Sequence, residues 1–278
     1  MCGILKNTRE IWEEVRAIPQ LIFILVSFFA SVIGSICGIG GGVIIKPVLD
    51  AFGLYSVSTI SFMSGCIVLS MTTYNVLKAK MANESVIEKG VSTWLGIGAA
   101  VGGLLGKQLF DVVKALFENA DTVGAVQAVA LFLVTLGTAI YTVNKSRIRT
   151  IRLEYPPACL LIGLALGVMS SFLGIGGGPI NLVVLYYFFS METKVAAQNS
   201  LYIILFSQLA SLIFTVVSGK VPQFPVVLFA LMVCCGILGG AVGRKINKKI
   251  DSETVSKLFL GLMVVIMGIC CYNFFRYC

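Results

Sequence analysis

The chain has 278 residues, of which 58% are hydrophobic and only 12% are charged. Because a soluble domain carries about a quarter charged residues, this composition excludes an ordinary soluble fold and predicts an integral membrane protein. The net charge of +8 does not indicate nucleic-acid binding, since Lys and Arg in the loops of a membrane protein set its topology. The absence of His removes the commonest general base and the commonest metal ligand, so neither a metal nor a cofactor is expected.

Residues 1–20 mix three basic and three acidic side chains with apolar positions at helical spacing, which predicts a short amphipathic helix at the membrane surface. The next apolar region, residues 21–55, is too long for one crossing of ~20 residues and short for two. Its middle carries Gly38-Ile39-Gly40-Gly41-Gly42, and four glycines in five residues are expected to break a helix. We therefore expect two half-helices or a re-entrant hairpin.

The rest of the first half and the whole second half follow one pattern. A basic loop at residues 145–152 and the pair Pro156-Pro157 mark a new beginning. After it comes a second broken region, residues 158–190, with its own glycine cluster. Unbroken apolar segments predict crossings at residues 57–77, 91–110, 123–143, 195–217, 225–242 and 255–275.

An internal repeat organises the chain. Glycine clusters and polar residues recur at an offset of 136 or 137 residues. The repeat defines two similar halves, residues 21–150 and 151–278, each with one broken region and three crossings. The matching residues are Gly38–Gly42 with Gly174–Gly178, Ser64 with Ser200, Gly102-Gly103 with Gly239-Gly240, and Lys107 with Arg244.

The basic loops predict the orientation of the two halves. Loops at residues 145–152 and 244–249 are both expected on the cytoplasmic side. Between them lie one broken region and two crossings, so the broken region must return to the side on which it began. Each half then makes three net crossings, and this odd number inverts the second half. The predicted fold is an all-α integral membrane protein of two inverted-topology repeats, each with a glycine-broken re-entrant hairpin and three transmembrane helices.

The two glycine clusters are the expected substrate site. A half-helix that starts after Gly42 or Gly178 points its N-terminal N–H groups into the membrane, and that positive end suits an anion. The alternative is that the glycines only allow close helix packing. Ser64 and Ser200 are included because the repeat pairs them and hydroxyls replace the hydration of an oxyanion. The predicted substrate-binding residues are Gly40, Gly41, Gly42, Lys46, Ser64, Gly176, Gly177, Gly178, Asn181, Asn199 and Ser200.

Lys46 is the charged residue that we place deepest in a broken region. A cation in hydrocarbon is costly, so such a residue is a functional candidate, and this one lies one turn after Gly42. The alternative, that it snorkels to a nearby interface, stays open. Its counterpart in the second half is Leu182, next to Asn181, which offers a neutral donor. Two acids near the ends of the broken regions, Asp50 and Glu192, are expected at solvated interfaces, with a role in relaying protons as the alternative.

These residues resemble a known family. The segments GIGGGVIIKPVL and GIGGGPINLVVL, with the later GGLLGKQL and GGAVGRKI, are similar to those of the TauE/SafE family of sulfite exporters. The resemblance covers essentially the whole chain after Pro19 and implies an ion-coupled carrier of small anions in the plasma (inner) membrane of a prokaryote. Lys46 and Pro47 are less typical of the first motif, which leaves room for an unusual substrate.

The sequence thus predicts a secondary transporter that moves a small oxyanion, most directly sulfite or an organosulfonate, by alternating access. An anion channel, or a carrier of another small carboxylate or sulfur-containing anion, is the alternative. A membrane enzyme is disfavoured because the chain has no His and no nucleophile–base pair. The expected partners are the anion and the lipid bilayer, and not nucleic acid. A coupling proton or sodium ion and a homo-oligomer are left open.

Overall fold

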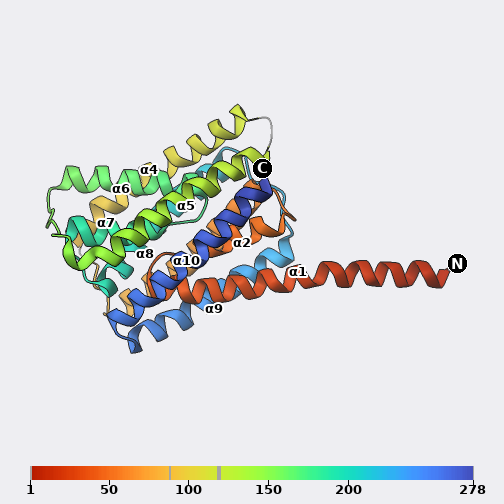
Figure 1. Cartoon of the computed structure of the whole chain (residues 1–278), viewed down its shortest axis with the longest axis horizontal. Coiled ribbons are helices and arrows are strands. Elements are labelled where there is room, and N and C mark those ends of the chain that lie inside the picture. The colour runs from red at the N-terminus through yellow and green to blue at the C-terminus, as the bar shows by residue number, and fades with distance from the viewer. Residues whose placement is uncertain (1, 88, 118–119, 278) are drawn as a thin grey trace.

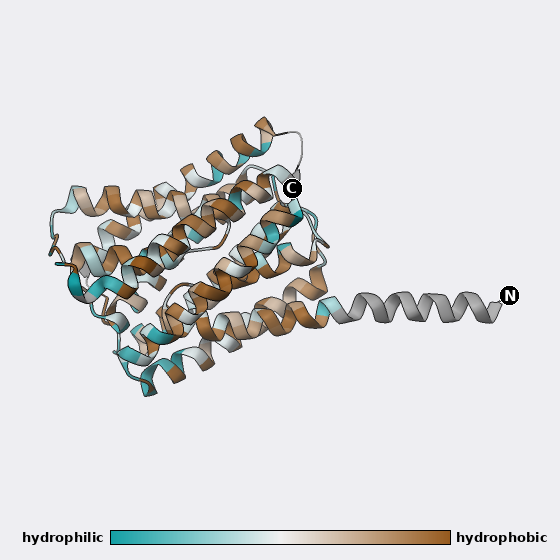
Figure 2. Ribbon diagram, viewed as in Figure 1, coloured by the Kyte–Doolittle hydropathy of each residue, from teal (hydrophilic) through white to brown (hydrophobic). Residues whose placement is uncertain are grey.

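The structure, a computed structural model, describes residues 2–87, 89–117 and 120–277. Within these residues every regular element is a helix, as the composition predicts. Eight of the helices are long and apolar enough to cross a membrane, and hydrophobic residues cover most of their length (Figure 2). The α-helices of Figure 1 are α1 (Cys2–Cys37), α2 (Gly42–Phe52), α3 (Val57–Met81), α4 (Lys89–Leu116), α5 (Ala120–Asn144), α6 (Pro156–Leu173), α7 (Pro179–Phe189), α8 (Thr193–Val217), α9 (Val226–Lys249) and α10 (Ser252–Tyr277).

The N-terminal helix is longer than predicted. Helix α1 runs without a break from Cys2 to Cys37, with Pro19 inside it. The helix expected at residues 1–20 is therefore continuous with the first apolar segment, Pro19–Cys37. The side chains that would make it amphipathic lie outside the described part of the chain, and its place at the membrane surface stays a prediction.

Each glycine cluster ends one helix and starts another, as predicted. The lengths of the pieces, however, differ from two half-helices. The apolar part of α1 has 19 residues and α6 has 18, so each is long enough to cross a membrane. Helices α2 and α7 have only 11 residues each, or roughly 16 Å. The expectation of half-helices is therefore wrong for the first piece of each region, because the glycines fall late in the apolar run.

The short helices bring the chain back toward the start of each broken region. At the end of α2, the ring of Phe52 lies 5.3 Å from the ring of Phe23, near the beginning of the apolar part of α1. At the end of α7, the carbonyl of Tyr187 accepts a 2.7 Å hydrogen bond from the N–H of Ile151, in the segment that leads into α6. The two helices of each broken region therefore run antiparallel to each other.

The second glycine pair of each half serves close helix packing. Helix α1 lies along α9, and α4 lies along α6 (Figure 1). A Cβ added to Gly239 of α9 would lie 2.3 Å from the carbonyl oxygen of Phe28. A Cβ added to Gly102 of α4 would lie 2.1 Å from that of Leu164. Small residues let membrane helices approach this closely and gain van der Waals contact.

Helix ends gather at two opposite faces of the bundle. At one face, which we call the basic face, Lys145 after α5 donates to Ser256 near the start of α10. This contact places the basic segments 145–152 and 244–249 at the same end. The prediction that residues 244–249 form a loop is wrong, because they are the last turns of α9. At the opposite face, Lys220 after α8 binds Asp111 near the end of α4.

Candidate functional site

Two buried loops, Gly38–Gly42 and Gly174–Gly178, share the backbone turn of their first three residues and are called here the glycine loops; they diverge at the fourth residue, where Gly41 has φ −69° and Gly177 has φ +130°. The first residues of the two loops, Gly38 and Gly174, have φ values of +74° and +65°. The third residues, Gly40 and Gly176, have φ values of +74° and +70°. Residues with a side chain adopt positive φ only at a cost, so this shared turn explains why both halves carry the same glycines.

The glycine loops contact each other. A Cβ added to Gly42 would lie 2.0 Å from the carbonyl oxygen of Ile175, and one added to Gly177 would lie 3.4 Å from that of Ile39. The approach leaves no room for a side chain at Gly42. The structure therefore brings the two predicted glycine clusters together into one place, between α3 and α8.

The two repeat-related serines lie buried on α3 and α8. Ser64 and Ser200 are both 0% exposed, and neither hydroxyl has a hydrogen-bond partner among the described residues. The hydroxyl of Ser64 would lie 2.9 Å from a Cβ on Gly42, so it faces the first glycine loop. A buried polar group without a partner costs about 1–3 kcal/mol. Such groups are candidates for binding a ligand.

The short helices begin at the glycine loops, but their first residues differ. Helix α2 begins with Gly42 and α7 begins with Pro179. The first N–H groups of a helix have no partner inside it and carry partial positive charge. Pro179 has no N–H, so α7 presents fewer donors than α2. Asn181, in the first turn of α7, is 1% exposed, and its Oδ1 has no partner among the described residues.

Lys46 lies buried in α2, and its charge is paired. Its Nζ lies 2.7 Å from Oδ2 of Asp50, one turn later, and the two side chains are only 4% and 5% exposed. Lys46 therefore does not snorkel to an interface. The expectation that Asp50 is solvated is wrong, because α10 covers it. Glu192, by contrast, is exposed, as expected.

One predicted residue, Asn199, lies in a different environment. Its side chain binds the hydroxyl of Ser92 on α4 and donates to the carbonyl of Val86 at 3.3 Å. These bonds join α8 to α4 and to the linker before it. The structure therefore does not bring Asn199 to the glycine loops, and its amide serves helix packing.

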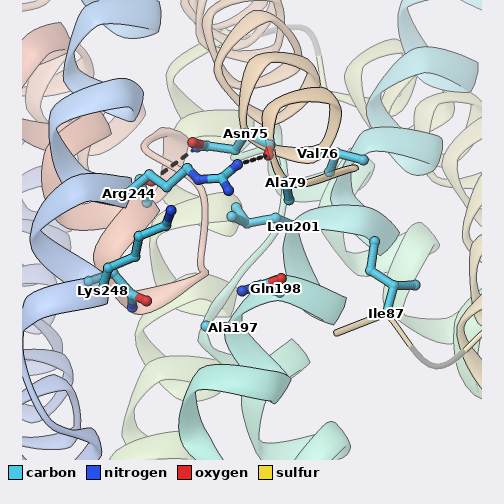
Figure 3. A pocket seen from close by; sticks show the side chains of 11 residues that line it. Asn75, Val76, Ala79, Ile87, Ala197, Gln198, Leu201, Arg244 and Lys248 are labelled. Carbon is cyan, nitrogen blue, oxygen red and sulfur yellow. Dashed lines mark hydrogen bonds between the residues drawn. The ribbon is translucent and has the colours of Figure 1, made fainter. Parts of the chain in front are cut away.

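A first pocket, the Arg244 pocket, opens at the basic face between α3, α8 and α9 (Figure 3). Arg244 reaches from α9 and donates to the carbonyl of Asn75 on α3 at 2.9 Å. The amide of Asn75 donates to Ser35 of α1 at 3.0 Å. The cavity volume is about 50 Å³, several times the ~10–15 Å³ that one water needs. The polar lining residues are Ser35, Asn75, Gln198, Arg244, Asn247 and Lys248.

A second pocket, the Lys107 pocket, opens at the opposite face and extends to Gly174 of the second glycine loop. Its cavity volume of about 320 Å³ makes it the wider of the two. Lys107 lies with its ammonium 4.7 Å from the ring of Phe110. The hydroxyl of Ser61 is buried without a partner among the described residues. The polar lining residues are Ser58, Ser61, Lys107, Asp111, Lys114, Ser171, Gln208, Ser211, Thr215 and Lys220.

An ion pair joins a linker to a helix at each pocket. Glu84, after α3, binds Arg244 at 2.6 Å and also binds Lys248 of α9. Hydrogen bonds from Lys248 and Arg244 hold the pKa of Glu84 below its ordinary value. Lys220, after α8, binds Asp111 of α4 at 2.8 Å. The repeat offsets of 136 and 137 relate Glu84 to Lys220 and Lys248 to Asp111, so the two pairs are equivalent with their charges exchanged.

Sequence reasoning noted Lys107 and Arg244 as a repeat pair but did not place either in the site. Both line a polar cavity in the structure. The signal was present, since a cation recurs at the same place in both halves of an apolar chain. From the sequence, Arg244 is assigned to a basic cytoplasmic segment, where Lys and Arg commonly set topology, and Lys107 is given no role.

Comparison with known proteins agrees with this architecture. A family model described as sulfite exporter TauE/SafE matches residues 23–269. The probable membrane transporter protein YunE of Bacillus subtilis (strain 168) is 24% identical over 271 residues, which cover 89% of this chain and 95% of that protein. The probable membrane transporter protein MamO of Magnetospirillum gryphiswaldense is 20% identical over 273 residues, which cover 87% of this chain and 43% of that protein. No solved structure matches the chain significantly.

Proposed function

The chain belongs to the TauE/SafE family of sulfite exporters, and we propose that it is a secondary transporter of a small oxyanion, most directly sulfite or an organosulfonate. It is a multi-pass membrane permease by its family and by its eight apolar helices. Because YunE and MamO are bacterial proteins, the proposed location is the plasma membrane of a prokaryote.

The observation that carries the proposal is the meeting of the glycine loops beside the unpartnered hydroxyl of Ser64, whose repeat counterpart Ser200 is likewise buried and unpartnered on α8. Ser64 and Ser200 are buried and occupy repeat-related places. The N-terminus of α2 adds the positive end of a helix dipole. These are neutral or partly positive donors, which hold an oxyanion without binding it so tightly that release becomes slow. The proposed site therefore consists of the glycine loops with Ser64 and Ser200.

Two repeat-related pockets support alternating access. Ser35 and Arg244 of the Arg244 pocket correspond to Ser171 and Lys107 of the Lys107 pocket. The pockets lie at opposite ends of α8, with the glycine loops between them. Inverted repeats give transporters one site that two symmetric arrangements expose in turn. The proposal assigns one pocket to access from each face, with the Lys107 pocket on the face opposite the basic segments.

The remaining candidates are separated by the kind of flux. A channel would also use broken helices and polar pockets. A carrier gives saturable flux and exchanges external for internal anion, which a channel does not. An enzyme is less consistent with the relatives, which are named as membrane transporters. Within the described residues, no three His, Cys, Asp or Glu lie close enough together to hold a metal ion.

The test is uptake of radiolabelled sulfite by proteoliposomes, with sulfoacetate, thiosulfate, sulfate and acetate as competitors. We expect saturable uptake that sulfoacetate inhibits and acetate does not. Inhibition by acetate alone would move the substrate to a carboxylate, and linear uptake without exchange would favour a channel.

The inverted repeat has its own test. Reporters fused after Arg149 and after Lys249 should both report cytoplasm, since both segments lie on the basic face. Signals from opposite sides would contradict the inverted arrangement, whereas two periplasmic signals would contradict only the predicted orientation.

A further inference from the structure

The buried pair of Lys46 and Asp50 has no equivalent in the second half. The repeat places Leu182 and Tyr186 at the corresponding positions. The anion site proposed above therefore has a charged pair on only one of its two short helices. A pair that the fold does not require in both halves is a candidate for a separate role.

Acceptor oxygens without partners surround this pair. Oδ1 of Asp50, Oε1 of Gln127 and Oδ1 of Asn273 have no hydrogen-bond partner among the described residues. All three side chains line one small cavity together with Lys46. Its volume is about 10 Å³, roughly what one water occupies. The cavity therefore brings a carboxylate together with two amide oxygens, and all three lack a hydrogen-bond donor. A proton on Asp50, or a water molecule in the cavity, would supply the missing donor.

The groups that face Asp50 leave Lys46 as its main counter-charge. From α10 come the guanidinium of Arg276, which binds the carbonyl of Asp50 at 2.7 Å, and the thiol of Cys270. From α5 comes Gln127, which does not titrate. The neighbours of α2 on α1 and α3 form an apolar cluster that includes Phe23, Ile60 and Met63.

Lys46 also lies close to the Lys107 pocket. A Cβ on Gly174 would lie 3.3 Å from Cε of Lys46, and Gly174 lines the Lys107 pocket. Gly174, which has no side chain, therefore lies between the lysine stem and the Lys107 pocket.

We propose that Asp50 carries the coupling proton of an anion–proton symporter. In this proposal, Lys46 exchanges its ion-pair partner, from Asp50 to the anion. This inference rests on the proposed transport function. With Asp50 ionised, the pair has no net charge and Lys46 is held. When a proton from the Lys107 pocket binds a carboxylate oxygen of Asp50, the pair carries one positive charge and Lys46 binds the anion. Release of the anion and the proton to the other side restores the ion pair.

The energetics favour coupled rather than separate loading. A lone buried charge is far more costly than a paired one. Protonating Asp50 alone leaves Lys46 unpaired, and binding the anion alone adds negative charge beside a neutral pair. Binding of the proton to Asp50 and binding of the anion to Lys46 each compensate the unpaired buried charge that the other creates, so the proton and the anion bind cooperatively.

The experiment measures anion accumulation and anion exchange in the same proteoliposomes, with the membrane potential held at zero. The probes are labelled sulfite and labelled sulfoacetate, whose sulfonate group stays ionised near neutral pH. In the wild type, an inward gradient of one pH unit should raise accumulation up to about tenfold for one proton per anion. Asp50→Asn should exchange internal for external anion but lose this dependence. Glu192→Gln, which changes an exposed carboxylate, should behave as the wild type.

Two further variants cover failure of Asp50→Asn to fold. Asp50→Glu keeps a titratable carboxyl and should keep proton-driven accumulation, whereas Lys46→Met/Asp50→Asn has a neutral pair and should not. Exchange without any effect of the pH gradient in the wild type would overturn the coupling and leave the transport function standing. Proton-driven accumulation in both variants that lack the carboxyl would overturn the role of Asp50. Absence of exchange and uptake for both anions would overturn the transport function and the coupling with it.

Discussion

The two glycine loops differ less in backbone than in the side chains that follow them. Both turn through positive φ at their first and third residues, and each lies beside a buried hydroxyl without a partner, that of Ser64 at Gly42 and that of Ser61 at Gly174. The first loop then leads to Lys46 and Asp50, whereas the second leads to Leu182 and Tyr186. The comparison indicates that the frame of the site is common to both halves and that its charge comes from one. Substitutions that disrupt the glycine-loop backbone and substitutions that remove the charges of Lys46 and Asp50 should therefore have different effects.

The largest effect is expected from Gly42→Ala. The new Cβ would overlap the carbonyl of Ile175, since only 2.0 Å separates the two positions. Backbone cannot yield as a flexible side chain does, so we expect a loss on the order of 4–5 kcal/mol or more in stability, and no transport. Thermal unfolding in detergent and sulfite uptake measure this. Gly137→Ala, in α5 with nothing within 4 Å, is the control and should transport normally.

A smaller but still large effect is expected from Lys46→Met. It leaves the buried carboxylate of Asp50 without its partner, which typically costs about 3–5 kcal/mol. Lys46→Met/Asp50→Asn, which removes both charges at nearly unchanged volume, should recover most of that stability. The measurement is the unfolding midpoint of the three proteins. A double variant as unstable as Lys46→Met would show that the pair matters through shape rather than charge.

The hydroxyls should affect binding more than folding. We expect Ser64→Ala and Ser200→Ala each to weaken sulfite binding about two- to tenfold, the worth of one hydrogen bond. Because neither hydroxyl has a partner in the protein, stability should not fall. Competition binding to purified protein measures the affinity. The control is Ser70→Ala, since the hydroxyl of Ser70 donates to the carbonyl of Cys66 within α3, and this variant should bind sulfite normally. Weaker binding in only one of Ser64→Ala and Ser200→Ala would mean that the site is asymmetric.

The smallest effect is expected at the ion pairs of the two pockets. Hydrogen bonds from Lys248 and Arg244 lower the pKa of Glu84 from the ordinary value of a glutamate side chain. Its ionised form therefore adds stability above that value, and this contribution is lost as the pH falls through the lowered pKa. Glu84→Gln should be slightly less stable than the wild type at pH 7 and indistinguishable in strong acid. A difference that persists in acid would mean that Glu84 acts by packing.

Local patterns in the sequence predicted the frame well. Helix, break and repeat are properties of short segments, so the glycine clusters and the six unbroken crossings followed from composition and spacing. The length of the first pieces was missed because the glycines were assumed to sit at mid-membrane. The loop in fact folds back on α1, where a Cβ on Gly41 would lie 3.1 Å from the hydroxyl of Ser31.

Features that depend on distant contacts were not predictable in this way. The burial of Asp50 comes from α10, more than 200 residues away, where Asn273 binds the carbonyl of Pro47. Asn199 was placed in the site by its neighbour Ser200, but successive helix residues face different directions. The Arg244 and Lys107 pockets each need several helices from both halves. None of these relationships is visible within one segment of sequence.

The central claim is that an oxyanion binds where the two glycine loops meet. It is tested most directly by a crystal structure with selenite, a sulfite analogue whose selenium scatters anomalously. The account predicts an anomalous peak beside the glycine loops, placed so that a selenite oxygen lies within hydrogen-bond distance, ~3 Å, of the hydroxyl of Ser64 or Ser200. A peak confined to the outer part of the Lys107 pocket or the Arg244 pocket, or no peak at all, would contradict it.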